Sequence, residues 1–198
     1  MNYGEILTCD VANGPGMRVT LFVSGCTHHC KGCFNGDTWA FDYGKPYTAE
    51  VKQGILEELS QPWMQGITFL GGEPMEPENQ HEVLSTMKAI REQFGDSKDI
   101  WVYSGYTFEE LTDASLKSRA YTAMTKEILM TADVLVDGPF ILEKKDIRLN
   151  FRGSSNQRIL DLKQSMKGSA HPVLAQTGTE RSEPSETQIL SPVSISVC

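Results

Sequence analysis

Short runs of apolar and β-branched residues recur along the chain, and each run is followed by a loop that contains glycine. The runs cover residues 18–23, 66–70, 100–103 and 133–136. Runs of this length and composition are typical of buried β-strands. The most distinctive short motifs of the chain therefore lie just after predicted strands.

Amphipathic helical patterns separate these strands. One covers about residues 48–60, a second about residues 77–94, and a third begins at Thr107 and Glu110, which have the spacing of a capping box. Strands that alternate with helices predict βα units and a parallel sheet. Four or five such units are too few to close an eight-stranded barrel. We therefore predict an α/β fold: a partial, open (β/α) barrel, mostly parallel, with the helices outside.

The last part of the chain differs in composition from the rest. Residues 165–198 are rich in Ser, Thr, Pro, Glu and Gln, and their only apolar alternation is short, at residues 193–197. Such a segment has too little apolar surface to bury. The sequence predicts a folded domain over residues 1–164 and a flexible tail over residues 165–198.

Composition and charge narrow the class of protein. The chain has 198 residues, of which 39% are hydrophobic, and a net charge of -8. This charge argues against nucleic acid or an anionic membrane as a partner. The N-terminus lacks the features of a secretory signal, and no apolar run approaches the roughly 18 residues of a membrane span. We expect a cytoplasmic protein.

A loop at residues 25–35, called the cysteine loop below, carries the strongest chemical signal. Cys26, Cys30 and Cys33 have the spacing Cys-x3-Cys-x2-Cys. An ordinary 4Fe-4S cluster is held by four thiolates. Three thiolates leave one iron with an open position where a small molecule can bind and react, which is a catalytic arrangement.

Other interpretations of the cysteines remain open from the sequence. A structural zinc site could combine the three thiolates with His28, with His29 or with a ligand from a distant part of the chain. A disulfide framework fits less well, because Cys9 and Cys198 have no paired spacing. We expect Cys9 to be a buried or half-buried thiol. We expect the two histidines to point to solvent, the alternative being a route for protons or electrons.

Residues 71–74, Gly-Gly-Glu-Pro, form a second candidate motif, called the glycine turn below. Glycines tolerate positive φ and let the backbone approach a ligand closely. An ordinary turn between a strand and a helix is the alternative. If a ligand binds here, valine at Gly72 should damage ligand binding more than cluster assembly.

Taken together, the motifs resemble the radical S-adenosylmethionine superfamily, and within it the activating enzymes of anaerobic (class III) ribonucleotide reductases. The resemblance extends from about Asp10 to Gln157. It rests on residues 10–18, 21–35, 71–74, 101–106, 135–140 and 152–157. It implies that residues 1–164 form a radical S-adenosylmethionine domain with the partial barrel of that superfamily.

The resemblance also implies the cofactors. Cys26, Cys30 and Cys33 would hold one 4Fe-4S cluster, and the amino and carboxylate groups of S-adenosylmethionine would chelate the free iron. Reductive cleavage would give methionine and a 5'-deoxyadenosyl radical, which takes a hydrogen atom from a glycine of a large partner. No catalytic residue beyond the cluster and cofactor ligands is implied.

Further residues are assigned to S-adenosylmethionine by the resemblance. The glycine turn would hold the methionine end of S-adenosylmethionine, and residues beside the third cysteine would hold the adenine. A serine would lie near the ribose, the alternative being that this serine only ends a strand. These cofactor-binding residues are Gly32, Cys33, Phe34, Gly71, Gly72, Glu73 and Ser104. Asp10, Asn13 and Arg18 match the N-terminal signature of the family, where they brace the cluster loop or contact the ligand.

The implied partners are the large anaerobic ribonucleotide reductase subunit, as protein substrate, and a small reductant protein such as flavodoxin. An activase of another glycyl-radical enzyme, such as pyruvate formate-lyase, is the alternative within the family. The segment at residues 153–157 favours the reductase. A non-catalytic iron-sulfur or zinc binding module is the alternative outside it, and it would release no 5'-deoxyadenosine from S-adenosylmethionine.

Overall fold

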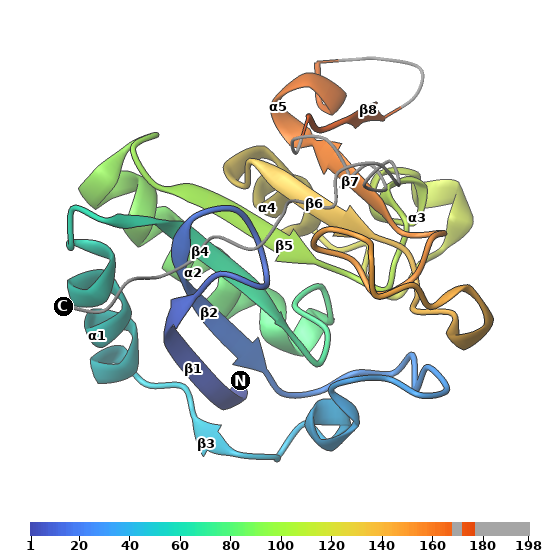
Figure 1. The fold of residues 1–198 in the computed structure, drawn as a ribbon, viewed down its shortest axis with the longest axis horizontal. Coiled ribbons are helices and arrows are strands. Elements are labelled where there is room, and N and C mark those ends of the chain that lie inside the picture. The colour runs from blue at the N-terminus through green and yellow to red at the C-terminus, as the bar shows by residue number, and fades with distance from the viewer. Residues whose placement is uncertain (168–171, 177–198) are drawn as a thin grey trace, which may run out of the picture.

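The structure of the chain is a computed structural model that describes residues 1–167 and 172–176 (Figure 1). In this part of the chain, one sheet has the strand order β3-β1-β2-β4-β5-β6-β7-β8. The strands are β1 (Asn2–Asp10), β2 (Met17–Val23), β3 (Lys45–Pro46), β4 (Met64–Gly71), β5 (Asp99–Tyr103), β6 (Val134–Asp137), β7 (Arg158–Asp161) and β8 (Val173–Leu174). β2, β4, β5 and β6 are parallel, whereas the outer strands pair antiparallel.

Helices lie between successive strands along the chain. They are α1 (Ala49–Leu59), α2 (Pro77–Phe94), α3 (Phe108–Thr112), α4 (Thr125–Thr131) and α5 (Leu162–Ser165), with short 3-10 helices η1 (Gly36–Trp39), η2 (Ala114–Leu116) and η3 (Leu142–Lys144). All four predicted strands and the two long predicted helices are confirmed. The capping box is also confirmed, because Thr107 accepts from the N–H of Glu110 and the Glu110 carboxylate accepts from the N–H of Thr107.

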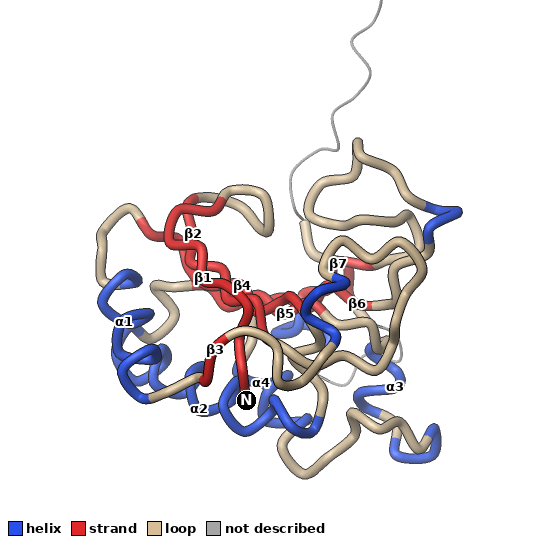
Figure 2. The backbone as a smooth tube through the Cα atoms, turned by 90° about the horizontal axis from the view of Figure 1, so that it is seen from below, coloured by secondary structure: helices blue, strands red, loops and turns tan. Residues whose placement is uncertain are grey.

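The two faces of the sheet have different surroundings. Val19, Leu21 and Val23 of β2 belong to the main core, and Figure 2 shows α1, α2 and α4 along one side of the sheet. The alternating residue Phe22 and the β5 residue Tyr103 instead line a cavity. The fold is therefore a mixed α/β structure with an open sheet that is parallel in its middle.

The chain beyond α5 returns briefly to the sheet. β8 pairs antiparallel with β7, and the N–H of Val173 donates to the Ser165 hydroxyl. Both contacts involve residues that the sequence placed in the tail. The alternation at residues 193–197 and Cys198 lie outside the described residues, so the domain boundary stays a prediction. Within the described residues, no helix has the length and apolar character needed to cross a membrane.

Candidate functional site

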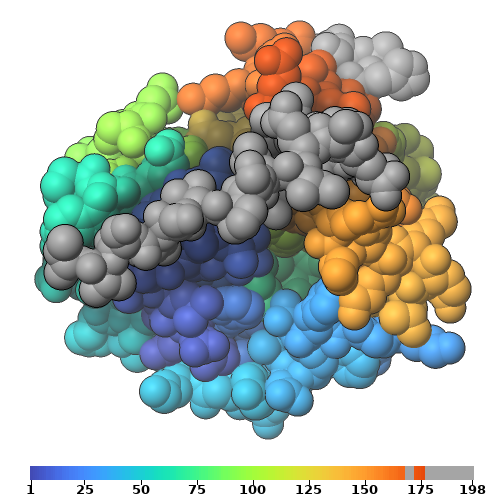
Figure 3. All heavy atoms as spheres, viewed as in Figure 1, coloured from blue at the N-terminus to red at the C-terminus, as the bar shows by residue number. Residues whose placement is uncertain are grey.

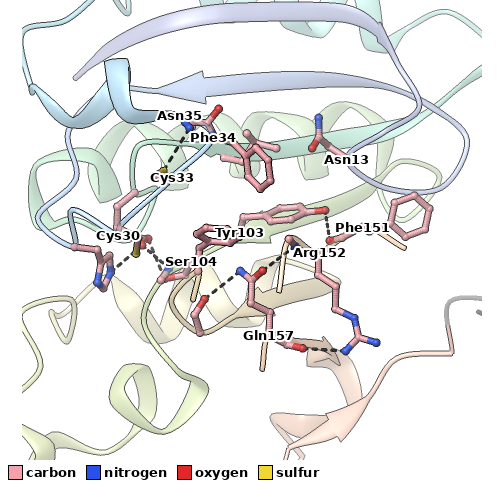
Figure 4. A pocket seen from close by; sticks show the side chains of 18 of the residues that line it. Asn13, Cys30, Cys33, Phe34, Asn35, Tyr103, Ser104, Phe151, Arg152 and Gln157 are labelled. Carbon is pink, nitrogen blue, oxygen red and sulfur yellow. Dashed lines mark hydrogen bonds and ion pairs between the residues drawn. The ribbon is translucent and has the colours of Figure 1, made fainter. Parts of the chain in front are cut away.

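The loops after β2, β4, β5 and β6 meet around one cavity of about 390 Å³. The cysteine loop, the glycine turn, Ser104 and Gly138 all contribute to its lining. Figure 4 shows side chains of the cysteine loop facing Tyr103 and the segment from Phe151 to Gln157. The volume is within the range of about 300–1,000 Å³ that small-molecule sites occupy. Parallel strands thus bring the predicted motifs to one edge of the sheet.

The three thiols of the cysteine loop line this cavity together. Cys26 is buried, Cys30 and Cys33 are half-buried, and none of them forms a disulfide. Burial, with Glu73 nearby, raises the pKa of the Cys26 thiol to about 12, and burial also raises the pKa of Cys30. The raised pKa keeps both thiols protonated near neutral pH, so binding of iron by their thiolates would release protons here.

Unusual backbone conformations fold the cysteine loop around the thiols. Gly25, His29 and Gly32 have positive φ angles of 97°, 47° and 72°. The N–H of Cys33 donates to the carbonyl of Cys30 at 3.1 Å. A Cβ atom at Gly25 would lie 2.2 Å from the ring of Phe41, so only glycine fits there.

The glycine turn forms backbone hydrogen bonds with the end of β2 and with the cysteine loop. The N–H of Gly72 donates to Val23 O at 2.7 Å, and the N–H of Glu73 donates to Gly25 O at 2.8 Å. A Cβ atom at Gly72 would lie 2.6 Å from Gly25 O. The first atom of a side chain there would push against the loop that carries the cysteines. The structure therefore predicts that valine at Gly72 disturbs the cluster as well as ligand binding, whereas the sequence predicted that it would spare the cluster.

Glu73 is 1% exposed and joins several loops. Its Oε1 accepts from the Ser104 hydroxyl at 2.9 Å and from the N–H of Met75 at 2.8 Å. Its Oε2 accepts from the N–H of Gly105 at 2.7 Å. A buried carboxylate with this many donors is stabilised in place. Ser104 is likewise buried, and its hydroxyl also accepts from the N–H of Tyr106.

His28 is another partner of Glu73. Its Nε2 lies 3.2 Å from Glu73 Oε2, and its ring contacts the ring of Tyr106 with 4.3 Å between centroids. Burial alone would lower the pKa of His28, but the Glu73 carboxylate outweighs it and raises that pKa. The expectation that His28 points to solvent is wrong. His29 is exposed, as expected, and lies beside Trp39.

A second buried carboxylate, Glu76, braces the same loop and was not identified from the sequence. It accepts from the N–H of Thr27 at 3.0 Å and from the Thr27 hydroxyl. Its other oxygen accepts from Arg119 Nε at 2.7 Å. An acidic residue next to Pro77 reads as the ordinary start of a helix, so the sequence held no signal for this role.

Of the residues predicted to lie at the adenine side, Cys33 and Phe34 line the cavity, whereas Gly32 is not part of its lining. The Phe34 ring is 64% exposed and packs edge-to-face on Phe140, with 5.2 Å between centroids. Lys145 Nζ lies 4.7 Å from the centroid of Phe34. Gly32 lies against Leu142, whose side chain would be 3.0 Å from a Cβ atom.

The N-terminal signature residues brace a different loop from the expected one. Arg18 is fully buried and donates to Pro15 O at 2.8 Å and to Asp99 at 2.6 Å. Asp10 accepts from Asn13 at 2.6 Å. These contacts hold residues 11–16, of which Ala12 and Asn13 line the cavity. Within the described residues, no hydrogen bond or ion pair joins Asp10 or Arg18 to the cysteine loop.

The donor set of the cavity fits an iron-sulfur cluster better than zinc. In the described part of the chain, no three His, Cys, Asp or Glu side chains form a site for a single metal ion. Zinc needs four ligands that converge on one point, and the thiolates of a 4Fe-4S cluster bind separate irons. His28 is not free to act as a fourth zinc ligand, because it contacts Glu73 and Tyr106.

Cys9 is exposed, so the expectation of a buried or half-buried thiol there is wrong.

Comparison with known proteins agrees with this chemistry. A family model described as a 4Fe-4S single cluster domain matches residues 12–160. The chain is 43% identical over 161 residues to the anaerobic ribonucleoside-triphosphate reductase-activating protein of Vibrio cholerae, covering 80% of this chain and 97% of that protein. Proteins of the same name from two other bacteria are also similar. The one from Escherichia coli is 39% identical over 165 residues, covering 82% of this chain and 100% of that protein. The one from Haemophilus influenzae is 40% identical over 161 residues, covering 80% of this chain and 97% of that protein.

Proposed function

The chain belongs to the family of anaerobic ribonucleoside-triphosphate reductase-activating proteins, and from this premise we propose that it generates a glycyl radical on the large anaerobic ribonucleotide reductase subunit. It is an enzyme of the radical S-adenosylmethionine type in this proposal. The observation that carries the proposal is the meeting of three free thiols and the glycine turn in one cavity.

Cys26, Cys30 and Cys33 are the proposed cluster ligands. The chemistry that a 4Fe-4S cluster with bound S-adenosylmethionine supplies is one-electron cleavage of the bond between sulfur and C5', which yields methionine and a 5'-deoxyadenosyl radical. The residues of the cavity would hold the cluster and cofactor so that one hydrogen atom could pass from the acceptor glycine to the deoxyadenosyl group, with 5'-deoxyadenosine as the product. The protein contributes position and protection from water.

The glycine turn is the proposed seat of the methionine end of S-adenosylmethionine. Gly71 has a φ of 108°, which brings the backbone to the cavity without a side chain. Glu73 fixes the turn through Ser104 and Gly105. Gly32, Cys33 and Phe34 are assigned to the adenine, and Ser104 to the ribose side, from which its hydroxyl also orients Glu73.

The fold type, the electron donor and the cellular setting complete the proposed function. The open sheet, with helices on one side and the cavity on the other, fits the partial (β/α) barrel of the superfamily. A small reductant such as flavodoxin is the proposed electron donor. A reducing cytoplasm is the proposed setting, since free thiols are needed to assemble the cluster.

Anaerobic reconstitution tests the function directly. The protein, loaded with iron and sulfide and reduced with dithionite, is mixed with S-adenosylmethionine and the purified reductase. We expect 5'-deoxyadenosine and a glycyl doublet in the EPR spectrum of the reductase. Pyruvate formate-lyase serves as the control acceptor, and a doublet on it but not on the reductase would reverse the assignment. Absence of 5'-deoxyadenosine would favour a binding module.

A further inference from the structure

A second hollow adjoins the cluster cavity and has no part in the function described so far. It has a volume of about 620 Å³ and lies between β1, η1 and residues 43–45. Phe22, Phe34 and Asn35 line both this hollow and the cluster cavity, so the two lie side by side. In Figure 3, residues near the N-terminus, drawn in dark blue, adjoin those of the cysteine loop and η1 in lighter blue. We call this hollow the side groove.

The lining of the side groove suits a polypeptide. Glu5, Asp37 and Lys45 are exposed charged residues, and Tyr43 contributes a ring that is 41% exposed. Small-molecule sites are mostly apolar, whereas protein-binding surfaces combine aromatic rings with hydrogen-bonding groups. The backbone of Gly4 also lines the groove.

The edge of β1 beside the groove is available for pairing. β3 pairs with β1 only at Asn2 and Tyr3. From Gly4 onwards, no strand among the described residues pairs with this edge of β1. An extended polypeptide can add to such an edge through main-chain hydrogen bonds.

The proposed reaction requires a narrow segment of the partner at the cluster cavity. The acceptor is a backbone Cα atom of a large protein, and hydrogen transfer requires the reacting atoms to be about 3–3.5 Å apart. A folded surface cannot enter a cavity of about 390 Å³. The glycine must therefore arrive on a narrow segment, and the residues next to it must rest outside the cluster cavity.

We propose that the side groove binds the segment of the reductase that flanks the acceptor glycine, with the backbone of that segment paired to the edge of β1. The inference rests on the proposed function and adds the docking surface to it. Glu5 and Asp37 outnumber Lys45 in the groove. A basic side chain in the bound segment is therefore favoured over an acidic one.

Surface variants with matched controls test the groove. Tyr43→Ala and Glu5→Arg alter it at exposed positions, and Tyr121→Ala and Glu58→Arg are the controls, Tyr121 being 44% exposed and Glu58 an exposed residue of α1. The reconstituted proteins are assayed for 5'-deoxyadenosine release without the reductase, for reductase affinity by calorimetry, and for glycyl radical yield. For the groove variants we expect unchanged release, an affinity weaker by about tenfold and a lower radical yield.

The outcomes separate this inference from the function beneath it. Groove variants that bind the reductase as wild type does, or controls that lose as much affinity, would overturn the docking surface. A wild-type protein that cleaves S-adenosylmethionine but leaves no radical on the reductase would instead overturn the proposed function. In either case, the reductase affinity measured by calorimetry decides whether the side groove binds the reductase.

Discussion

His28 Nε2 lies 3.2 Å from Glu73 Oε2, across the junction between the cysteine loop and the glycine turn. The same carboxylate accepts from Ser104 and Gly105 in the loop after β5. One buried charge therefore holds three loops that leave three neighbouring parallel strands. This contact couples the position of the cluster ligands to the turn proposed to hold the methionine end of S-adenosylmethionine.

Replacing Glu73 with glutamine should loosen that junction. The amide keeps one acceptor oxygen, so the N–H of Gly105 or the donors to Oε1 lose their partner, at a cost of about 1–3 kcal/mol. The melting temperature should fall by about 2–4 °C per kcal/mol, and affinity for S-adenosylmethionine should fall with it. Glu58→Gln on exposed α1 is the matched control. Equal melting temperatures and affinities in both variants would contradict the bracing role.

Each cysteine of the cysteine loop should be essential for the cluster. Alanine at Cys26, Cys30 or Cys33 should abolish iron retention after anaerobic reconstitution, because no spare thiol lines the cavity among the described residues. Cys9→Ala should keep its iron and sulfide, since Cys9 is exposed and does not line the cavity. Iron and sulfide analysis measures both. Iron retained without Cys30 but lost without Cys9 would reverse the assignment.

The local parts of this fold are readable from sequence and the non-local parts are not. Thr107 and Glu110 predicted their helix start because both partners lie within one turn. β1 was not predicted, because its residues do not alternate regularly between buried and exposed positions. Its place in the sheet depends on antiparallel pairing with β2. β7 begins with Arg158 and ends with Asp161, so it lacks the apolar run that marked the equally short β6. These two strands make the outer parts of the sheet antiparallel.

The candidate site divides in the same way. The spacing of the cysteines and the paired glycines are features of contiguous sequence, so the sequence alone placed them. The contacts of Glu76 with Thr27 and Arg119 span 49 and 43 residues along the chain. Only tertiary packing brings such residues together, and His28 looked like a solvent-facing residue for the same reason.

Alanine at Gly72 should impair cluster assembly as well as S-adenosylmethionine binding. Its Cβ atom would lie 2.6 Å from Gly25 O and 2.9 Å from Thr38 O, both of them backbone atoms that cannot swing aside. Gly54→Ala in α1 is the control, because nothing lies within 4 Å of a Cβ atom there. That control should gain about 0.5–1 kcal/mol of helix stability. A Gly72→Ala protein with full iron content and weakened ligand binding would restore the earlier expectation.

The carboxylate of Asp10 should give a pH-dependent contribution to stability. Burial alone would raise its pKa, but hydrogen bonds from Thr20, Ala12 and Asn13 outweigh it and hold the pKa below 3.8. A lowered folded pKa stabilises the protein above pH 3.8, and that stabilisation is lost as pH falls through the folded value. Asp10→Asn should cost about 1–3 kcal/mol at pH 7, and its difference from wild type should shrink below about pH 3.8. Urea unfolding of cluster-free protein measures this, and a pH-independent difference would contradict it.

Two C-terminal truncations should differ in stability. Ending the chain after Gln176 keeps every motif and contact described above, so we expect the melting temperature and 5'-deoxyadenosine yield to stay close to those of the full chain. Ending it after Ser165 removes β8, whose residues pair with Leu160 and Asp161 of β7 and whose neighbour Ala175 donates to Ile159 O. The exposed edge of β7 should then lower the melting temperature by several degrees, since each lost hydrogen bond contributes about 0.5–1.5 kcal/mol. Equal stability of the two truncations would show that β8 adds nothing, and a large loss already after Gln176 would place an essential element in residues 177–198.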